Sequence, residues 1–403
     1  MKIELFKEYR GLNKGNYILF FGKTMTALGS MVWPLLTFIL SGRLNLSAKE
    51  IALIFTIYTL LMIPLNFLGG KLADKYNKKN IIIICDLLSV SAFIYCGLSE
   101  LSIFSMCIYA LGSLFQTMEM PSYSALVSEI TMPKDRERAY SLNYLGTNLG
   151  MILSPTLGGL LYKNHLNLIF LLNGISIFLS TTLIFFFFKE IKVENNSTIE
   201  NIKVEGSVFK VFKLYPILLI FLIFYGVYGG LYNQYSYLIP LDLARVHGDN
   251  GALIYGSVNT LNCIVVVIFT PLFTRYLAKL SEINKITVTY LLIGISYILF
   301  NLFLGKVFMY YILMMIFTWG EVLSTLALDP YISRRTPNEY KGRMFSLSKI
   351  AVYLFASIGQ LLSGFIYDMM GSSIVWIITI VLCLIGFVLG FFLNKIDKEI
   401  FRI

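Results

Sequence analysis

Long apolar runs separated by short polar turns make up almost the whole chain. Most runs approach or exceed the about 20 residues that a helix needs to cross a bilayer. The pattern predicts an all-α polytopic membrane protein with twelve transmembrane helices. We place the spans at residues 16–41, 50–70, 80–98, 102–128, 139–162, 166–188, 214–241, 251–274, 286–304, 307–331, 344–368 and 372–394.

The longest polar stretch, residues 189–213, divides these spans into two sets of six. The two halves resemble each other at an offset of 205 residues, which aligns Ser141 with Ser346 and Gly159 with Gly364. Internal duplication is typical of transporter folds, with the substrate site near mid-membrane where the repeats meet. We therefore predict two pseudo-symmetric six-helix bundles. They cover residues 1–188 and 214–403, and 189–213 forms a cytoplasmic linker.

Composition and charge agree with a membrane location. Hydrophobic residues make up 57% of the chain and charged residues 14%, whereas a soluble domain has about 25% charged residues. With the N-terminus inside, 26 of the 33 Lys and Arg residues lie on the cytoplasmic side and 5 outside. This bias predicts a multi-pass protein of the cell (plasma) membrane with both termini in the cytoplasm. The net charge of +10 therefore does not indicate nucleic acid as a partner.

The five cysteines all fall in apolar runs without metal-ligand spacing. No nucleotide-binding or hydrolase pattern is present either. We expect no metal, no cofactor and no enzymatic activity.

The loop between the second and third spans carries a recognisable motif. Gly70 is followed by Asp74-Lys75 and then by Lys78 and Lys79. This order resembles the loop signature of the major facilitator superfamily, although the family usually has Gly where this chain has Asn77. Because Asn is the residue after Gly that best tolerates a positive φ, we expect that backbone conformation at Asn77. A generic positively charged hairpin remains the alternative interpretation.

The resemblance implies a cytoplasmic gate at this loop. Asp74 and its neighbouring lysines would act as a latch between the two halves. The family pattern also implies an acid at the inner end of the fourth span, Glu129, which we expect to pair with Arg136 or Arg138. The implied gate consists of Gly70, Asp74, Lys75, Lys78, Lys79, Glu129 and Arg138.

The fifth span contains Gly150, Pro155, Gly158 and Gly159. This segment resembles the proline–glycine signature of the drug/proton antiporter branch of the superfamily, with Ser154 in place of a usual glycine. In the family this signature is linked to exchangers rather than importers. A kinked packing helix is the alternative, because proline removes a backbone hydrogen bond and glycines allow close helix contact.

Polar residues recur at helical spacing in four spans. In the first span Lys23, Thr26, Ser30, Trp33 and Thr37 are spaced 3, 4, 3 and 4 residues apart, which predicts one helix face. Such stripes should avoid lipid and face each other or water, and the family fold lines its cavity with spans one, four, seven and ten. The expected substrate contacts are Trp33, Gln116, Tyr225, Tyr228, Tyr232 and Trp319.

Acidic residues at lipid depth are the candidates for proton coupling. Glu321 lies near the middle of the tenth span and Glu119 in the fourth. A carboxylate there costs several kcal/mol unless it is paired, protonated or hydrated. Drug exporters of the family often carry an arginine in the fourth span, which is absent near Tyr109, so coupling is assigned to Glu321, Glu119 and Lys23. The alternative is static pairing of either acid with Lys23.

A further acid, Asp86, lies in the third span. We expect it to be a static partner of the basic loop that precedes this span.

These observations predict a monomeric secondary active transporter in the lipid bilayer. Its function would be proton-coupled efflux, an antiport of small lipophilic or cationic compounds by alternating access, as in multidrug efflux. One alternative is a proton-coupled importer of a small nutrient or metabolite. The other is a non-transporting membrane sensor or scaffold, which the short polar stretch 189–213 disfavours because a sensor is expected to carry a folded soluble module.

Overall fold

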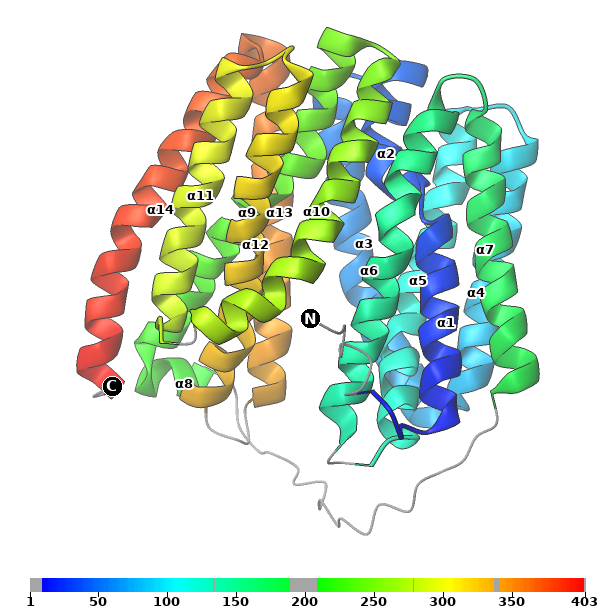
Figure 1. Cartoon of the computed structure of the whole chain (residues 1–403), viewed down its shortest axis with the longest axis horizontal. Helices are drawn as coiled ribbons and strands as arrows, with labels where there is room; N and C mark the ends of the chain where they lie inside the picture. The colour runs from blue at the N-terminus through cyan, green and yellow to red at the C-terminus, as the bar shows by residue number, and fades with distance from the viewer. Residues whose placement is uncertain (1–8, 133–134, 189–208, 278, 337–340, 402–403) are drawn as a thin grey trace. The chain divides into compact units, whose positions relative to one another are not determined.

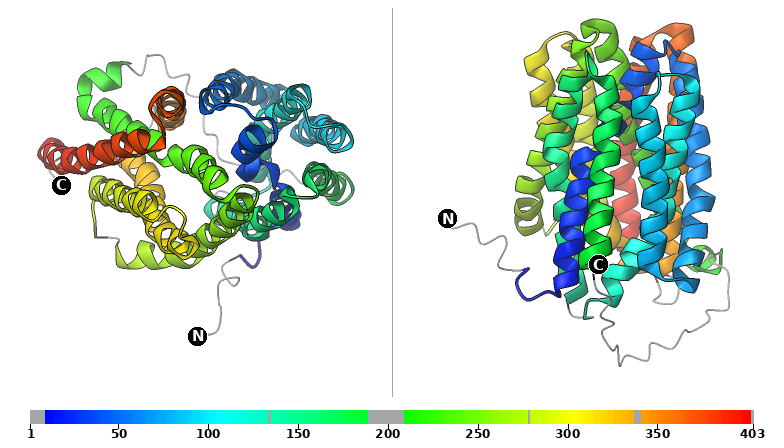
Figure 2. Two further views of the ribbon diagram at one scale, coloured as in Figure 1. Left: turned by 90° about the horizontal axis from the view of Figure 1, so that it is seen from above. Right: turned by 90° about the vertical axis from the view of Figure 1, so that its right-hand side faces the viewer.

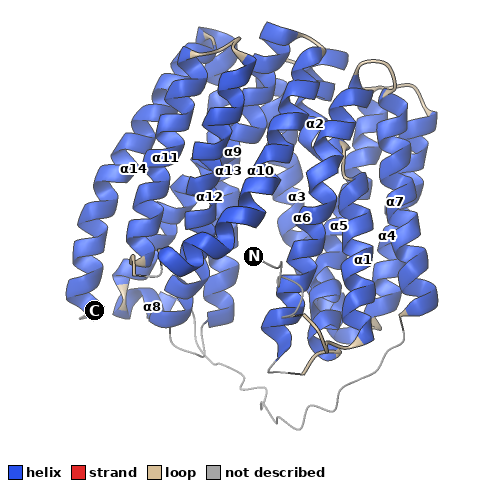
Figure 3. Ribbon diagram, viewed as in Figure 1, coloured by secondary structure: helices blue, strands red, loops and turns tan. Residues whose placement is uncertain are grey.

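The computed structural model describes residues 9–132, 135–188, 209–277, 279–336 and 341–401. Every regular element within those residues is helical (Figure 3). In chain order the elements are α1 (Lys14–Gly29), α2 (Val32–Phe38), the π-helical turn η2 (Ile39–Arg43), α3 (Ala48–Lys75), α4 (Lys78–Leu98), α5 (Ile103–Glu129), α6 (Arg136–Tyr162), α7 (Leu166–Phe187), α8 (Phe209–Leu214), α9 (Pro216–His247), α10 (Asn250–Tyr276), α11 (Glu282–Leu302), α12 (Val307–Arg335), α13 (Lys341–Met370) and α14 (Ser372–Phe401) (Figure 1).

Ten spans within the described residues are long and apolar enough to cross a membrane. The expectation of an all-helical, multi-pass membrane protein is therefore confirmed. Helices α5 and α6 are 27 residues long and coincide with the expected fourth and fifth spans. They are not among the ten because they carry more polar residues, including the buried Glu119 and Ser154.

The chain folds into two compact units, each built from helices that run side by side (Figure 2). In unit 1, α1 packs on α6 and α7, and α4 packs on α5 and α7. In unit 2, α9 packs on α13, and α11 packs on α12 and α14. Unit 1 comprises Met1–Asn45, Ile57–Thr198 and Asp249–Cys263, and unit 2 comprises Leu46–Thr56, Ile199–Gly248 and Ile264–Ile403.

The first expected span is broken rather than continuous. Helix α1 ends at Gly29, and α2 begins at Val32, with two residues between them. Pro34 explains the break, because a proline lacks an N–H and its ring clashes with the carbonyl four residues earlier. Thr37 is fully buried while Trp33 is 50% exposed. The expected single face that runs from Lys23 to Thr37 is therefore wrong.

The beginning of α3 belongs to unit 2. The Asp368 carboxylate, near the end of α13, accepts hydrogen bonds from the backbone N–H groups of Ala48 and Lys49 at 3.2 and 3.0 Å. A carboxylate at a helix N-terminus satisfies free N–H groups and interacts favourably with the helix dipole. Tyr237 of α9 donates a hydrogen bond to the carbonyl of Ala48. These contacts fix the first turn of α3 to α9 and α13.

The beginning of α10 belongs to unit 1 in the same way. A Cβ atom placed on Gly256 would lie 2.1 Å from the carbonyl oxygen of Pro155, so the two backbones touch there. Thr260 donates a hydrogen bond to the carbonyl of Ile152 at 2.6 Å. Its hydroxyl also lies 2.7 Å from that of Thr156. The first half of α10 is therefore held on α6 by backbone contact and by hydroxyl groups.

A buried ionic network joins three helices of unit 2. The Arg335 guanidinium binds the Asp397 carboxylate at 2.7 Å and the Glu282 carboxylate at 3.2 Å. The Tyr331 hydroxyl donates to the same Asp397 at 3.0 Å. The Arg335 and Asp397 side chains are only 3% and 2% exposed, whereas Arg334, which also binds Glu282, is 71% exposed. Arg335 therefore depends on its acidic partners, and Arg334 has water available.

This difference predicts unequal effects of two substitutions. Asp397→Asn removes the carboxylate that lies nearest to Arg335, at 2.7 Å, and breaking a buried pair costs about 3 kcal/mol or more. We expect it to lower the unfolding temperature of the detergent-purified protein by several degrees. Arg334→Ala removes an exposed pair worth less than about 1 kcal/mol, so its thermal unfolding should match that of the wild type. Equal shifts in the two variants would contradict a structural role for the buried network.

Candidate functional site

Two carboxyl groups meet in the interior of unit 1. Asp86 of α4 and Glu119 of α5 are each 5% exposed, and their side chains lie within hydrogen-bonding distance of each other. The Thr181 hydroxyl of α7 lies 2.7 Å from Oδ2 of Asp86. The expected pairing of Asp86 with the basic loop is wrong. Asp86 lies on the buried face of α4, which packs on α5 and α7.

A cation completes this group, which we call the acid cluster: Asp86, Glu119, Lys23 and Thr181. The charge of Lys23, on α1, acts on both carboxyls. Its Nζ lies 4.0 Å from the ring centroid of Tyr123. The Tyr123 hydroxyl donates to the carbonyl of Leu19 at 2.6 Å, so this ring is fixed against α1. The acid cluster thus draws side chains from α1, α4, α5 and α7.

A second candidate site lies in unit 2 around Glu321, which is equally far from both ends of α12. The Tyr232 hydroxyl is within hydrogen-bonding distance of the Glu321 carboxyl. The Ser324 hydroxyl donates to the Glu321 carbonyl at 2.8 Å and lies 2.6 Å from the Tyr228 hydroxyl. Because the single Ser324 hydrogen is used on the carbonyl, Tyr228 is the donor to Ser324.

Three tyrosine rings follow one another along α9 beside Glu321. The ring centroids of Tyr225 and Tyr228 are 5.3 Å apart, and those of Tyr228 and Tyr232 are 6.0 Å apart. Their spacing of three and four residues puts them on one helix face. Glu321, Tyr225, Tyr228, Tyr232 and Ser324 together form what we call the tyrosine–glutamate site.

The other predicted substrate contacts do not join either group so directly. Trp33 lies beyond the break in the first span, with its ring 5.7 Å from that of Tyr58. Trp319 packs on Phe269 with their ring centroids 5.5 Å apart. It lies two positions before Glu321 in the chain, so the helix turns the two side chains to different faces. Its indole N–H has no hydrogen-bond partner among the described residues. Gln116 is half-buried, one turn before Glu119 on the same side of α5.

The glycines of α6 lie against backbone. A Cβ atom on Gly150 would lie 2.5 Å from the carbonyl oxygen of Thr24 in α1, and one on Gly158 would lie 3.1 Å from Cβ of Met31. A Cβ atom on Gly159 would lie 2.6 Å from Cα of Leu253 at the beginning of α10. Helix α6, with Pro155 inside it, therefore meets the backbone of α1 at Gly150 and that of α10 at Gly159, whereas Gly158 makes room for side-chain atoms of Met31 and Leu35.

The basic loop between α3 and α4 is tied down by two lysines. Lys78 forms an ion pair with Glu129 at 2.7 Å, at the end of α5. Lys79 donates to the carbonyl oxygens of Phe185 and Phe188 at 3.0 and 2.8 Å. Lys75 is exposed. These contacts hold the beginning of α4 against α5 and α7.

Two expectations about this loop are wrong. Glu129 pairs with Lys78 rather than with Arg138, because the short turn before α4 places Lys78 beside the end of α5; Arg138 instead binds Asp135 at 2.8 Å. The side chain of Arg136, the other expected partner, lies outside the described residues. Asn77 has φ −62° rather than a positive φ, and its side chain caps α4 by accepting from the N–H of Asn80 at 3.0 Å.

Two other residues of the implied gate, Gly70 and Asp74, lie in the last turns of α3. The side chain of Asp74 lies outside the described residues. A Cβ atom on Gly70 would meet no atom within 4 Å. Close packing therefore does not require a glycine at that position.

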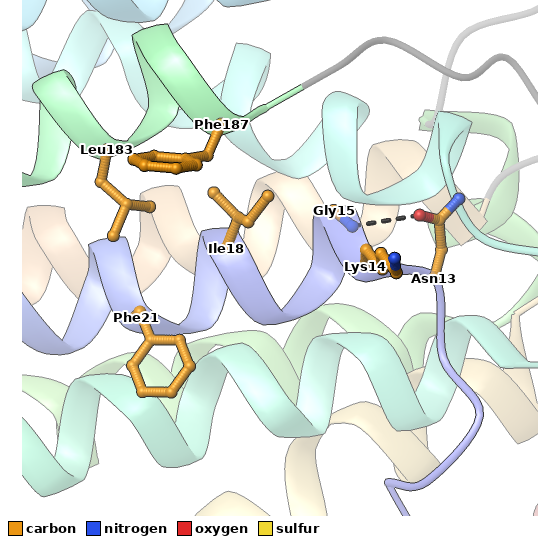
Figure 4. Close-up of a pocket in the computed structure, with 7 residues that line it drawn as sticks. All are labelled: Asn13, Lys14, Gly15, Ile18, Phe21, Leu183 and Phe187. Atoms are coloured by element: carbon orange, nitrogen blue, oxygen red, sulfur yellow. Dashed lines mark hydrogen bonds between the residues drawn. The ribbon is translucent and has the colours of Figure 1, made fainter.

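A separate surface pocket lies between α1 and α7 (Figure 4). Figure 4 shows the side chains of Ile18, Leu183 and Phe187 turned toward one another. Phe21 and Phe187, which also line it, are 54% and 68% exposed. Large exposed aromatic side chains on apolar helices are suited to contact with lipid chains. None of the acid-cluster residues lines this pocket.

Comparison with known proteins identifies the family. A profile described as the Major Facilitator Superfamily matches residues 19–326. The chain belongs to the Major Facilitator Superfamily. It is thus a member of a family of transporters, in agreement with the resemblance of the loop that begins at Gly70.

Several superfamily members are similar over much of the chain. An uncharacterised MFS-type transporter of Bacillus subtilis, YqjV, is 26% identical and covers 88% of this chain and 85% of its own. A Na⁺, Li⁺, K⁺/H⁺ antiporter of Planococcus maritimus is 22% identical over 79% and 81%. Multidrug resistance protein MdtH of Yersinia pestis is 27% identical over 37% of each chain.

Solved structures of other members show the same fold. The crystal structure of a peptide transporter POT matches with a TM-score of 0.79 at 17% identity and covers 98% of this chain and 96% of its own. A bacterial homologue of the human lysosomal transporter Spinster matches with a TM-score of 0.75 at 15% identity, over 96% and 98%. At these identities the likeness shows the superfamily fold alone.

Sequence reasoning missed Thr181 and the partnership of Asp86 with Glu119. The sequence held one signal that Asp86 is buried. The residues near it on the same helix face, at positions 82, 85, 89 and 93, are apolar or small. No such signal exists for Thr181, because its role depends on which face of α7 meets α4. Pairing between helices is decided by packing.

The glycine contacts of α6 predict a contrast between two small substitutions. Gly150→Ala forces a methyl group against the carbonyl oxygen of Thr24, and overpacking of this kind costs about 1–3 kcal/mol. We expect a lower unfolding temperature in detergent. Gly70→Ala meets open space inside a helix, where alanine is favoured by about 1 kcal/mol, so its unfolding temperature should be equal or higher. A Gly150→Ala protein as stable as the Gly70→Ala protein would contradict the close contact.

Proposed function

We propose that this superfamily member is a proton-coupled exporter, an antiporter of small lipophilic or cationic compounds that works by alternating access. It would act as a monomer in the cell membrane, with twelve spans and both termini in the cytoplasm. Residues 1–188 and 214–403 would form the two six-helix bundles, and residues 189–213 the cytoplasmic linker between them.

The tyrosine–glutamate site is the observation that carries this proposal. A carboxylate in the middle of a membrane helix is retained only if it is neutralised by a proton, a cation or water. The faces of the Tyr225, Tyr228 and Tyr232 rings attract cations, and this attraction reaches about 2 kcal/mol or more where water is excluded. Glu321 with these rings suits a lipophilic cation. Because a proton and a cation would compete for one carboxylate, binding of one favours release of the other.

Two further observations support export. Helix α6 carries the segment from Gly150 to Gly159 that resembles the antiporter signature, and its glycines contact α1 and the beginning of α10 through backbone. Among the similar proteins, one is named a cation/proton antiporter and one a multidrug resistance protein. In this proposal Trp33, Gln116 and Trp319 remain candidates for substrate contact, and Glu119 and Lys23 for proton coupling.

A proton-coupled importer of a small nutrient or metabolite is the second candidate. At the place where drug exporters of the family carry an arginine, this chain has Tyr109, whose ring stacks on Phe93 at 4.7 Å and meets Phe170 at 5.6 Å. That aromatic packing supplies no cation for the usual coupling route. The direction of pH-driven flux separates the two candidates.

A cytoplasmic gate at the α3–α4 loop belongs to the same proposal. Gly70, Asp74 and Lys75 would form its moving part. The remaining gate residues, Lys78, Lys79, Glu129 and Arg138, are bound within unit 1 and would serve as its anchor.

Glu321→Gln tests the proposed coupling. We expect accumulation of a fluorescent lipophilic cation, ethidium, in inverted membrane vesicles to lose most of its dependence on an imposed pH gradient, because glutamine cannot exchange a proton for a cation. Tyr232→Phe, which removes only the hydroxyl beside Glu321, should weaken ethidium binding while gradient dependence remains.

Glu100→Gln is the matched control, since Glu100 is an exposed acid outside the helices. Its gradient dependence should equal that of the wild type. Transport by Glu321→Gln that stays fully gradient dependent would remove Glu321 from coupling. Movement of ethidium by the wild type in the same direction as the protons, rather than in the opposite direction, would favour the importer.

Asp74→Asn tests the gate. We expect the maximal rate of ethidium transport to fall several-fold while the ethidium affinity measured at equilibrium stays within about twofold, because a latch acts on the conformational step and not on the binding site. The same measurements on Lys163→Gln, an exposed cation at the other end of the bundle, provide the control. Unchanged turnover in Asp74→Asn would argue against the latch.

A further inference from the structure

We infer that Asp86 and Glu119 share a single proton, and that this carboxyl pair, with Lys23 as its counter-ion, is a proton-binding site inside unit 1. The site involves residues of four helices and is separate from Glu321. The binding of a proton at this site is inferred from the contacts of its residues. The further step, that this proton is the one transported, rests on the proposed function.

The carboxyl groups of Asp86 and Glu119 contact each other. Their side chains lie within hydrogen-bonding distance, and both are 95% or more removed from solvent. Two ionised carboxylates at that distance repel each other strongly, and neither has a hydrogen to donate. One proton between them removes the repulsion and makes the hydrogen bond. The geometry therefore requires a protonated partner.

A second feature of this pair is an unmatched oxygen. Oε2 of Glu119 is buried and has no hydrogen-bond partner among the described residues. An ionised carboxylate oxygen without a donor in such a place carries a large desolvation cost. A proton on the pair satisfies the contact between the two carboxyls and leaves less charge on this oxygen. A protonated Glu119 therefore costs less free energy at this place than an ionised one.

Thr181 provides a third feature. Its hydroxyl lies 2.7 Å from Oδ2 of Asp86 and 2.8 Å from the carbonyl oxygen of Ile177. A hydroxyl has one hydrogen and can also accept. When that hydrogen points to Ile177, Oδ2 must carry a proton to bond with Thr181; when Asp86 is ionised, the hydroxyl turns toward it. Thr181 therefore accommodates both protonation states of Asp86 without moving its backbone.

Charge balance sets the number of protons. The ionisable groups that face the pair are Lys23 from α1, Cys85 from α4 and Tyr123 from α5, and Thr181 is the hydroxyl from α7. Among these only Lys23 is cationic. With one proton the pair and Lys23 sum to zero, and loss of that proton leaves one negative charge in the bundle. Only an O–H bond breaks in this step, and the proton leaves to water.

This arrangement gives the two acidic sites different roles. Glu321, beside tyrosine rings, is suited to an organic cation. The four residues of the acid cluster include no aromatic ring, and the neighbouring ring of Tyr123 is already in contact with Lys23. The acid cluster in unit 1 would then bind a proton only, whereas Glu321 in unit 2 would bind a proton and the substrate in turn. Coupling between them would require the conformational change of the whole carrier.

Infrared spectroscopy of the full-length protein in liposomes tests the inference without a substrate. The carbonyl stretching band of protonated carboxyl groups is recorded between neutral and strongly alkaline pH. The measurements are made in a Glu321→Gln background, so that a proton on Glu321 adds nothing to the band. This background takes the place of the wild type in the infrared comparison, and we expect it to show one protonated carboxyl group at neutral pH. Asp86→Asn and Glu119→Gln should each abolish the whole band, because the acid that remains is ionised beside Lys23. Lys23→Met should keep the band to higher pH.

Control variants distinguish a proton shared by Asp86 and Glu119 from a protonated carboxyl group elsewhere. Glu100→Gln should leave the band unchanged, and Thr181→Val should shift its frequency while its amplitude is kept. Size-exclusion chromatography confirms that each variant is folded; if an amide variant is not, the wild type and Thr181→Val decide alone. Absence of the band in the wild type, or its persistence in either amide variant, would overturn the inference. So would a band abolished by sodium chloride but not by choline chloride, which would indicate a sodium site.

Ethidium transport distinguishes failure of the inference from failure of the proposed function. If both hold, Glu119→Gln should bring the ratio of transport with and without a pH gradient close to one, while Glu100→Gln keeps the wild-type ratio. A wild type that shows the shared-proton band but no gradient-driven transport would refute the proposed function and leave the proton site standing. Gradient-driven transport without the band would refute the proton site alone.

Discussion

A charge inside a bundle of membrane helices has to be neutralised by the bundle itself, because lipid offers neither water nor counter-ions. Unit 2 meets this constraint with complete networks. Asp397 and Glu282 are matched there by Arg335 and Arg334, and buried Asp242 is matched by Arg245 and accepts hydrogen bonds from Trp376 and Tyr367. The acid cluster of unit 1 differs, since two carboxyls face a single lysine. This excess of acid over base distinguishes a group suited to exchanging a proton from one suited only to holding helices together.

Backbone contact has a second role. Helix α6 touches α1 and the beginning of α10 through glycines, and the beginning of α3 is capped by Asp368 from α13. Each compact unit thus takes the first turns of one helix from the other half of the sequence. These contacts combine backbone, hydroxyl groups and one carboxylate with the buried rings of Tyr237 and Tyr255.

The features that were predicted correctly from the sequence depend on properties of each segment by itself. Span length and hydropathy decide which segments enter a membrane, so the helical class and most span positions followed from composition alone. The predictions that were wrong concern single residues that act on the helix backbone. Asn77 caps α4 rather than adopting a positive φ, and Pro34 breaks the first span, so the regular spacing from Lys23 to Thr37 does not lie on one face.

The sequence by itself determined that the chain is a helical membrane protein with acids and tyrosines at lipid depth, because hydrophobic periodicity and charge bias are properties of each segment. It also supplied the family, through the motif that begins at Gly70. Only the tertiary structure decided which polar groups meet: Asp86 with Glu119 and Thr181, Tyr232 with Glu321, Lys78 with Glu129. These pairs join different helices, and the rotation of each helix about its axis is fixed by packing against its neighbours, which no single segment encodes.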